Sequence, residues 1–127
     1  MGNTERIRTE LAELTGAATW ILQTTYGEVI FFIHTVKVGT HAGENVLMGI
    51  SMQGNEGYPD IPPHFIHVPE GITDGQDGPH HCYNLPDGRT YHAFSRPPKP
   101  EEWDRVPERS MKTYINIHLP RFWRYAQ

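Results

Sequence analysis

Cys82 is the first residue that could do chemistry, because it is the only cysteine in the chain. Two histidines, His80 and His81, come directly before it. A thiolate is a strong nucleophile, and a neighbouring imidazole can polarise the thiol or accept its proton. Alternate side chains of an extended segment share a side, so His80 is better placed than His81 to act on Cys82. The pattern predicts a cysteine nucleophile.

A simpler interpretation of Cys82 is structural, since a free cysteine is more often a small buried apolar residue than a nucleophile. The surrounding sequence favours the nucleophile. Residues 69–89 are polar, contain four glycines and are expected to form one long loop with Cys82 in its middle. Loops of this length in a compact domain usually serve a function.

Eight histidines and one cysteine raise another alternative, a zinc site. The chain has no Cys-x-x-Cys or His-Glu-x-x-His spacing. His64 and His67 are three residues apart on an expected strand and would face opposite sides of a sheet. Chelation by His80, Cys82 and His92 stays open on geometry. We expect a protein that holds no metal and no cofactor.

The elements around these residues predict an α+β domain. Ile7, Leu11 and Leu14 recur with helical spacing, and residues 110–119 form a second helical segment that Pro120 should end or kink. Between them, runs rich in β-branched and aromatic residues alternate with turn signals. We expect helices at 5–14 and 110–119, and strands at 18–25, 29–36, 45–52 and 64–68. The four strands in succession predict an antiparallel meander that leads into the long loop.

The composition limits the class of protein. A chain of 127 residues can enclose one core, so residues 1–127 are expected to form a single domain. A net charge of -4 with scattered acidic residues argues against a nucleic-acid partner. No apolar run approaches the roughly 20 residues that span a bilayer, and the first residues lack an export signal. With a single cysteine and no disulfide, we expect a cytoplasmic protein with no membrane partner.

Several motifs follow one another in an order that is found in one enzyme family. They are the segment 6–14 with its Arg-Ile-x-x-Glu-Leu pattern, Tyr58-Pro59-Asp60-Ile61-Pro62-Pro63, Cys82 in the loop beyond, and Trp103 before the segment 110–119. In this order the chain resembles ubiquitin-conjugating (E2) enzymes. It is most similar to the minimal E2-like proteins of prokaryotic ubiquitin-like operons, which the segment 87–96 also resembles.

The resemblance implies an activity and its partners. The Cys82 thiolate would take the C-terminal carboxyl of a ubiquitin-like protein from an E1-like activating enzyme, and would pass it from the thioester to an amine of a target protein. The resemblance also implies the UBC-like layout of an N-terminal helix, a four-stranded meander, an active-site loop and a C-terminal helix. Arg6 and Arg8 would meet the activating enzyme, although a solvated helix face is the simpler interpretation.

One departure from the family concerns the oxyanion. The His-Pro-Asn triplet that E2 enzymes carry shortly before the cysteine is absent from this chain. Whatever replaces its asparagine should lie among His80, His81 and Asn84, whose amide can donate to a tetrahedral oxyanion.

The same departure leaves two roles open. Asp87 could orient or deprotonate an incoming lysine, or Asp87-Gly88 could simply form a hairpin turn. The missing triplet also keeps a different class of function in view, a catalytically inactive module that binds a ubiquitin-like protein or peptide.

Overall fold

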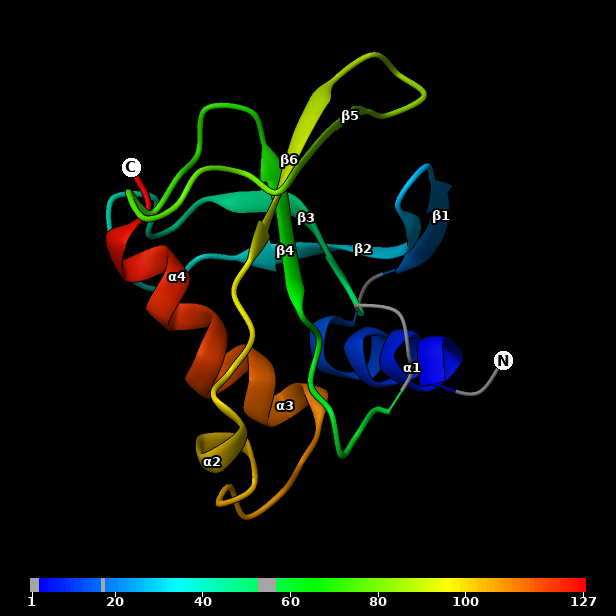
Figure 1. The fold of residues 1–127 in the computed structure, drawn as a ribbon, viewed down its shortest axis with the longest axis vertical. Coiled ribbons are helices and arrows are strands. Elements are labelled where there is room, and N and C mark those ends of the chain that lie inside the picture. Colours follow the sequence, from blue (N-terminus) through cyan, green and yellow to red (C-terminus); the bar gives the residue numbers. More distant parts are fainter. Residues whose placement is uncertain (1–2, 17, 53–56) are drawn as a thin grey trace.

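One antiparallel sheet forms the centre of the computed structural model, which describes residues 3–16, 18–52 and 57–127 (Figure 1). Its strands lie in the order β1-β2-β3-β4-β6-β5, so β1 and β5 are the two edges. The first four strands run as a meander, and β5 and β6 add a hairpin whose second strand pairs with β4. The bounds are β1 (Trp20–Thr24), β2 (Gly27–Thr35), β3 (Asn45–Ser51), β4 (Phe65–Pro69), β5 (His81–Asn84) and β6 (Thr90–Ser95).

The expected UBC-like layout, with four strands and one long active-site loop, is wrong. The segment 69–89 contains β5, and with β6 the sheet has six strands. The cause is the turn at Asp87-Gly88, where the Leu85 N–H donates to the Arg89 carbonyl at 2.8 Å and Gly88 has a φ of 94°. Such a turn reverses the chain and pairs the residues on either side of it. The protein is mostly strands, with a few short helices.

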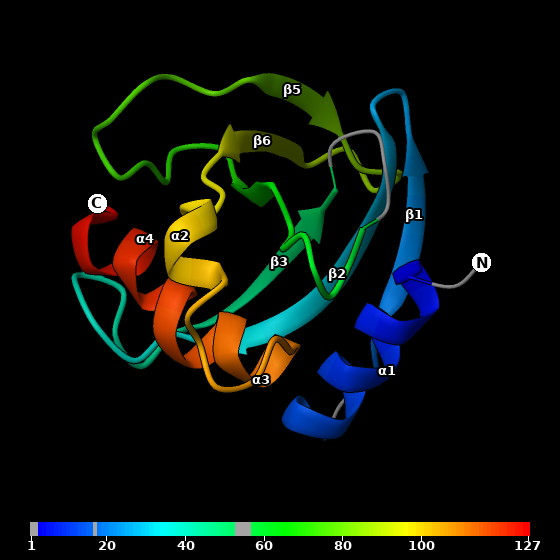
Figure 2. The ribbon, with the colours of Figure 1, turned by 60° about the horizontal axis from the view of Figure 1, so that its bottom comes forward.

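The six strands curl into a half barrel (Figure 2). At one end the two edges of the sheet approach each other, where the ring of Tyr26 stacks on His81 with 3.9 Å between centroids. The concave side of the curled sheet is called the inner side. There Leu22 from β1 packs against a buried cluster that contains Leu85 and Tyr91. Side chains therefore fill the space inside the curl.

The helices cover the other face of the sheet. Helix α1 (Asn3–Thr15) buries Ile7 and Leu11 against it, as the helical spacing predicts, whereas Leu14 remains 42% exposed. Tyr58 ties α1 to the proline-rich segment by donating its hydroxyl to Glu10 at 2.5 Å. The larger of the two buried clusters lies on this face, which therefore carries the main core. Each large apolar side chain buried in it stabilises the fold by about 1.5–3 kcal/mol.

The C-terminal helix continues past Pro120. It is made of α3 (Met111–Thr113), a π-helical stretch η1 (Tyr114–His118) and α4 (Leu119–Tyr125), while α2 (Pro100–Trp103) stands before it. Ser110, expected from the sequence as the first residue of the helix, instead caps its start by accepting from the Thr113 N–H. The wider π turn precedes Pro120, whose missing N–H falls in the first turn of α4, so the helix does not end there. None of the helices in the described ranges has the length and apolar character needed to cross a bilayer.

Candidate functional site

Cys82 lies in the edge strand β5 and is exposed. The sequence left the exposure of Cys82 open, and in the structure the residue is exposed but lies in a strand rather than in the long loop expected for residues 69–89. Through His92, its partner in β6, Cys82 is in line with Val68 of β4, which belongs to the core under the helices. At the edge of the sheet the thiol is beyond the cover of the helices.

His92 lies directly opposite Cys82 in the sheet, and the sequence had suggested it only as a metal ligand. The two residues are direct cross-strand partners. Backbone hydrogen bonds alternate along an antiparallel pair, and the Leu85 N–H bonds to Arg89. Cys82 lies three positions before Leu85. Cys82 and His92 therefore form a non-hydrogen-bonded pair, in which Cβ atoms approach to about 4.5–5.5 Å. The signal for this pairing was present in the turn at Asp87-Gly88.

His80 and His81 do not share the side of Cys82. The chain bends at His80, whose N–H donates to the Ala93 carbonyl, and its ring lies 4.6 Å from His81 and 5.4 Å from Phe65. His81 faces the inner side of the sheet, where it stacks on Tyr26. Burial, together with the nearby His80, lowers the pKa of His81. The structure therefore does not place His80 beside the thiol, where the spacing along one strand had suggested it.

Asn84 is two residues from Cys82 and on the same side of β5. Its Oδ1 accepts a hydrogen bond of 2.9 Å from the hydroxyl of Thr90 on β6. This contact fixes the orientation of the amide and turns its nitrogen, the donor end, away from Thr90. Asn84 is thus the sequence-derived oxyanion candidate that the structure brings to the side of the thiol.

Asp87 belongs to the hairpin turn. Its carboxylate accepts from the Nε of Arg89 at 2.8 Å and from the Arg89 backbone N–H at 3.0 Å. These hydrogen bonds from Arg89 lower the pKa of Asp87. A carboxylate held in this way is a weak base, so the turn interpretation of Asp87-Gly88 accounts for the residue.

A groove runs beside Cys82, between the two edges of the half barrel. Its volume is about 470 Å³, and residues 22–26 of one edge and 82–86 of the other line it. Because Cys82 and Asn84 stand in non-hydrogen-bonded pairs with β6, their backbone N–H and C=O groups point outward from the sheet. A sheet edge of this kind can accept a further extended strand.

On the inner side of the same hairpin lies a network of buried hydrogen bonds, which the sequence did not predict. His67 is 2% exposed, and its two ring nitrogens bond to Ser51 Oγ and to the Tyr83 hydroxyl, each at 2.7 Å. Burial, with a smaller effect from His81, lowers the pKa of His67 to about 3, so the ring is neutral. Within the described ranges, no three His, Cys, Asp or Glu side chains converge as metal ligands.

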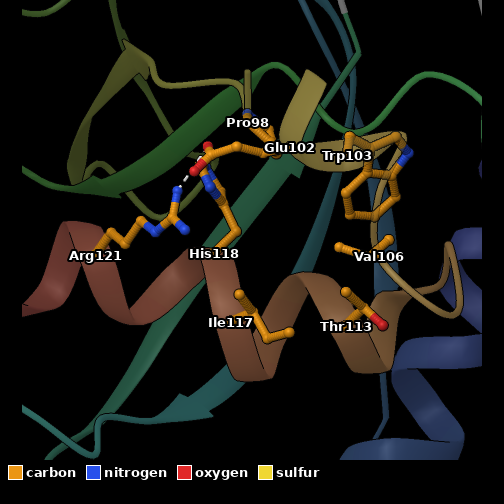
Figure 3. A pocket seen from close by; sticks show the side chains of 8 residues that line it. All are labelled: Pro98, Glu102, Trp103, Val106, Thr113, Ile117, His118 and Arg121. Carbon is orange, nitrogen blue, oxygen red and sulfur yellow. Dashed lines mark hydrogen bonds and ion pairs between the residues drawn. The ribbon is translucent and has the colours of Figure 1, made fainter. Parts of the chain in front are cut away.

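A further pocket lies away from Cys82, between α2 and the C-terminal helix (Figure 3). Apolar parts of Trp103 and Ile117 face it, and the ion pair of Glu102 with Arg121, at 2.8 Å, stands at its rim. His118 bonds through Nε2 to the Arg96 carbonyl at 2.7 Å. Burial lowers the pKa of His118.

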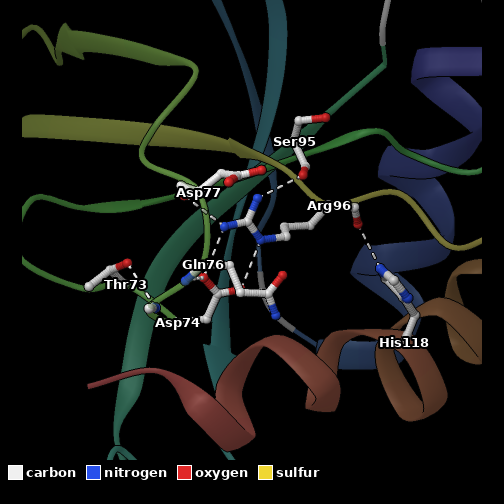
Figure 4. Close-up of polar contacts among 8 residues, drawn as sticks. Thr73, Asp74, Gln76, Asp77, Ser95, Arg96 and His118 are labelled. Carbon is white, nitrogen blue, oxygen red and sulfur yellow. Dashed lines mark hydrogen bonds and ion pairs between the residues drawn. The ribbon is translucent and has the colours of Figure 1, made fainter.

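Arg96 itself binds the segment 74–77, which lies ahead of β5 in the chain (Figure 4). Its guanidinium donates to both carboxylate oxygens of Asp74, at 2.8 and 2.9 Å, and to the Asp77 carbonyl. Burial alone would raise the pKa of Asp74, but the hydrogen bonds from Arg96 and from the Gln76 N–H outweigh it and leave that pKa lowered. Both carboxylate oxygens of Asp74 are thus hydrogen-bonded to Arg96, and this ion pair holds the segment in place.

The residues that the structure brings together at the exposed thiol are therefore Cys82, His92 and Asn84. Comparison of the chain with protein-family models, curated proteins and solved structures gives no match. The function has to be inferred from this edge of the sheet.

Proposed function

We propose that this protein carries a ubiquitin-like protein as a thioester on Cys82 and transfers it to an amine, as E2 enzymes do. The modifier would arrive from an E1-like activating enzyme and leave on a target protein. The observation that carries the proposal is the exposed thiol on an edge strand beside a groove of about 470 Å³.

The groove supports the proposal because it suits an extended peptide. An added strand would bond to the outward N–H and C=O groups of Cys82 and Asn84. A C-terminal tail bound in that way would bring its terminal carbonyl carbon to the thiol. Main-chain hydrogen bonds of this kind accept many sequences, and the walls of the groove would select among them.

The chemistry needs a base and an oxyanion donor, and both classes of group are present. His92 would accept the thiol proton as the sulfur attacks the carbonyl of the incoming thioester. The amide nitrogen of Asn84 would donate to the tetrahedral oxyanion. Collapse of that intermediate expels the activating enzyme's thiolate, which takes up a proton. In the second step, an amine attacks the Cys82 thioester, the Cys82 thiolate leaves, and His92 takes the proton that the amine loses.

The test uses a synthetic peptide thioester that ends in glycine, and then a ubiquitin-like protein with its activating enzyme and ATP. Intact-mass spectrometry should show one added acyl group that a reducing thiol removes. Cys82→Ala should abolish the adduct, and Cys82→Ser should give an adduct that resists reduction. His80→Ala is the matched control and should leave the adduct unchanged. The catalytic proposal is wrong if the activating enzyme becomes charged and no adduct forms on this chain.

A second candidate is a module that binds a ubiquitin-like protein or peptide at the same groove without catalysis. It is favoured by one observation: His81 and Asp87, two candidates for acid–base chemistry, are occupied by Tyr26 and Arg89. Under this alternative, calorimetry would detect binding of the modifier to the Cys82→Ala variant as tight as to the unaltered protein, with no adduct on either.

A further inference from the structure

A separate cavity of about 310 Å³ lies between the end of β2 and the C-terminal helix, far along β2 from the Cys82 groove. Each wall comes from a different part of the chain. His34, Lys37 and Val38 form one side. The other side is made by η1 and α4, through Ile115, Asn116, Pro120, Trp123 and Arg124.

The charge of this cavity is opposite to that of the whole chain. The chain has a net charge of -4, yet the lining contains Lys37 and Arg124 and no carboxylate. Neither cation takes part in an ion pair among the described residues. The neighbouring cavity at Arg96 and Lys99 differs, because Asp74 and Glu102 line it as well.

Two further side chains complete the lining. The amide of Asn116 brings N–H groups to the wall. Trp123 also lines the cavity, while its indole nitrogen is buried away from solvent and, within the described residues, has no hydrogen-bond partner.

The cavity is held in shape by close packing. Gly39 has a φ of 83°, and a Cβ at this position would overlap the carbonyl oxygen of Trp123. The turn that carries Lys37 is therefore seated directly on the C-terminal helix. The ring of His34 stacks on Trp123, with 6.2 Å between centroids and planes 24° apart. Both cations are presented from a rigid base.

From these observations we propose that the cavity binds a phosphate monoester, with the phosphate between Lys37 and Arg124 and its organic group against Val38, Ile115 and Pro120. A guanidinium binds two phosphate oxygens at once, and an ammonium adds a point charge. The cavity is larger than a phosphate needs, and its apolar walls would exclude water from an aliphatic or aromatic substituent. The proposal is independent of the chemistry at Cys82.

Phenyl phosphate is the probe, compared with inorganic phosphate and with benzoate. Calorimetry should show that phenyl phosphate binds more tightly than either, and that affinity falls with added salt. Lys37→Ala and Arg124→Ala should each weaken binding by about tenfold. The indole N–H resonance of Trp123 should shift on titration. That of Trp103, which already donates to the Pro59 carbonyl at 2.8 Å, should stay in place.

Arg121→Ala is the matched control, because Arg121 lies one turn before Arg124 and pairs with Glu102 in another pocket. It removes the same charge and should leave the affinity unchanged. The proposal is overturned if phenyl phosphate does not bind, or if Arg121→Ala weakens binding as much as Arg124→Ala. A shift of the Trp103 resonance without one of Trp123 would also overturn it, since the ligand would then lie elsewhere.

Discussion

Tyr83 and Cys82 are neighbours in β5, yet they belong to opposite environments. Tyr83 points inward, and its hydroxyl closes the chain of hydrogen bonds from Ser51 through His67. Cys82 points to the other side and is exposed. The hydroxyl of Tyr83 is hydrogen-bonded within the fold, whereas the thiol of the adjacent residue is accessible to reagents.

The two sides of β5 therefore have different roles, because the inner side stabilises the fold and the outer side carries the reactive group. His67 has both ring nitrogens bonded and is neutral because of its burial, so the inner network anchors β5 to β3 and β4. On the other side, Cys82 and His92 face each other as cross-strand partners without a common network. The inner side should respond to substitution with changes in stability, and the outer side with changes in reactivity.

The largest effect should come from acid, through the buried histidines. Burial lowers the pKa of His67 to about 3, and burial with the nearby Lys37 lowers that of His34 to about 4, below the ordinary 6.5. Between these values only the unfolded state takes up the protons. Stability should therefore be complete above pH 6.5 and fall as the pH drops towards 5, by up to about 1.4 kcal/mol per pH unit for each histidine. Urea unfolding at pH 7, 6 and 5 measures this slope.

The variant His34→Gln isolates the contribution of His34 to that slope. It should reduce the pH dependence by the share of His34 and leave the part due to His67 and to His81 and His118, whose pKa values are lowered as well. A slope that is the same in the variant and in the unaltered protein would mean that His34 titrates normally in the folded state.

Tyr83→Phe tests the inner network at the hairpin itself. The change removes the partner of His67 Nδ1 and should lower the free energy of unfolding by about 1–2 kcal/mol, because a buried ring nitrogen is left unbonded. Tyr26→Phe is the matched control, since Tyr26 is 49% exposed and contacts His81 through its ring. Equal losses in the two variants, measured by urea unfolding, would contradict the anchoring role.

The sequence was most informative where local patterns decide the structure. The spacing of Ile7 and Leu11 identified the buried side of α1, and the β-branched runs marked the regions of β1 to β4. The pairing of β5 with β6 was missed because its few residues lie among glycines and prolines, and only the turn at Asp87-Gly88 signals it. The expected fold failed for this reason.

At the candidate site, the sequence pointed to Cys82, and the structure places other side chains beside it than the spacing along one strand suggested. Counting along a single strand favoured His80, but a bend turns that ring towards Phe65. His92 is ten residues away in sequence, and only the register of the hairpin brings it opposite Cys82. This register is set by the turn at Asp87-Gly88, and counting along a single strand does not show it.

The outer side is tested by the rate at which iodoacetamide alkylates Cys82 near pH 7. His92→Ala should slow alkylation by about threefold, because the thiolate loses its neighbouring base. His81→Ala should leave the rate unchanged, since His81 faces the inner side. A larger effect from His81 than from His92, followed by mass spectrometry, would reverse the assignment of the two faces.

The smallest effect should be that of Cys82→Ser on stability. An exposed thiol at the sheet edge makes little contribution to packing, and such substitutions usually change the free energy of unfolding by less than about 0.5 kcal/mol. The urea midpoint and slope should match those of the unaltered protein, although the residue next to it, Tyr83, is sensitive. A loss of more than about 1 kcal/mol would mean that the sulfur is packed against its neighbours. In that case β5 would have two structural faces, and the groove would lose its nucleophile.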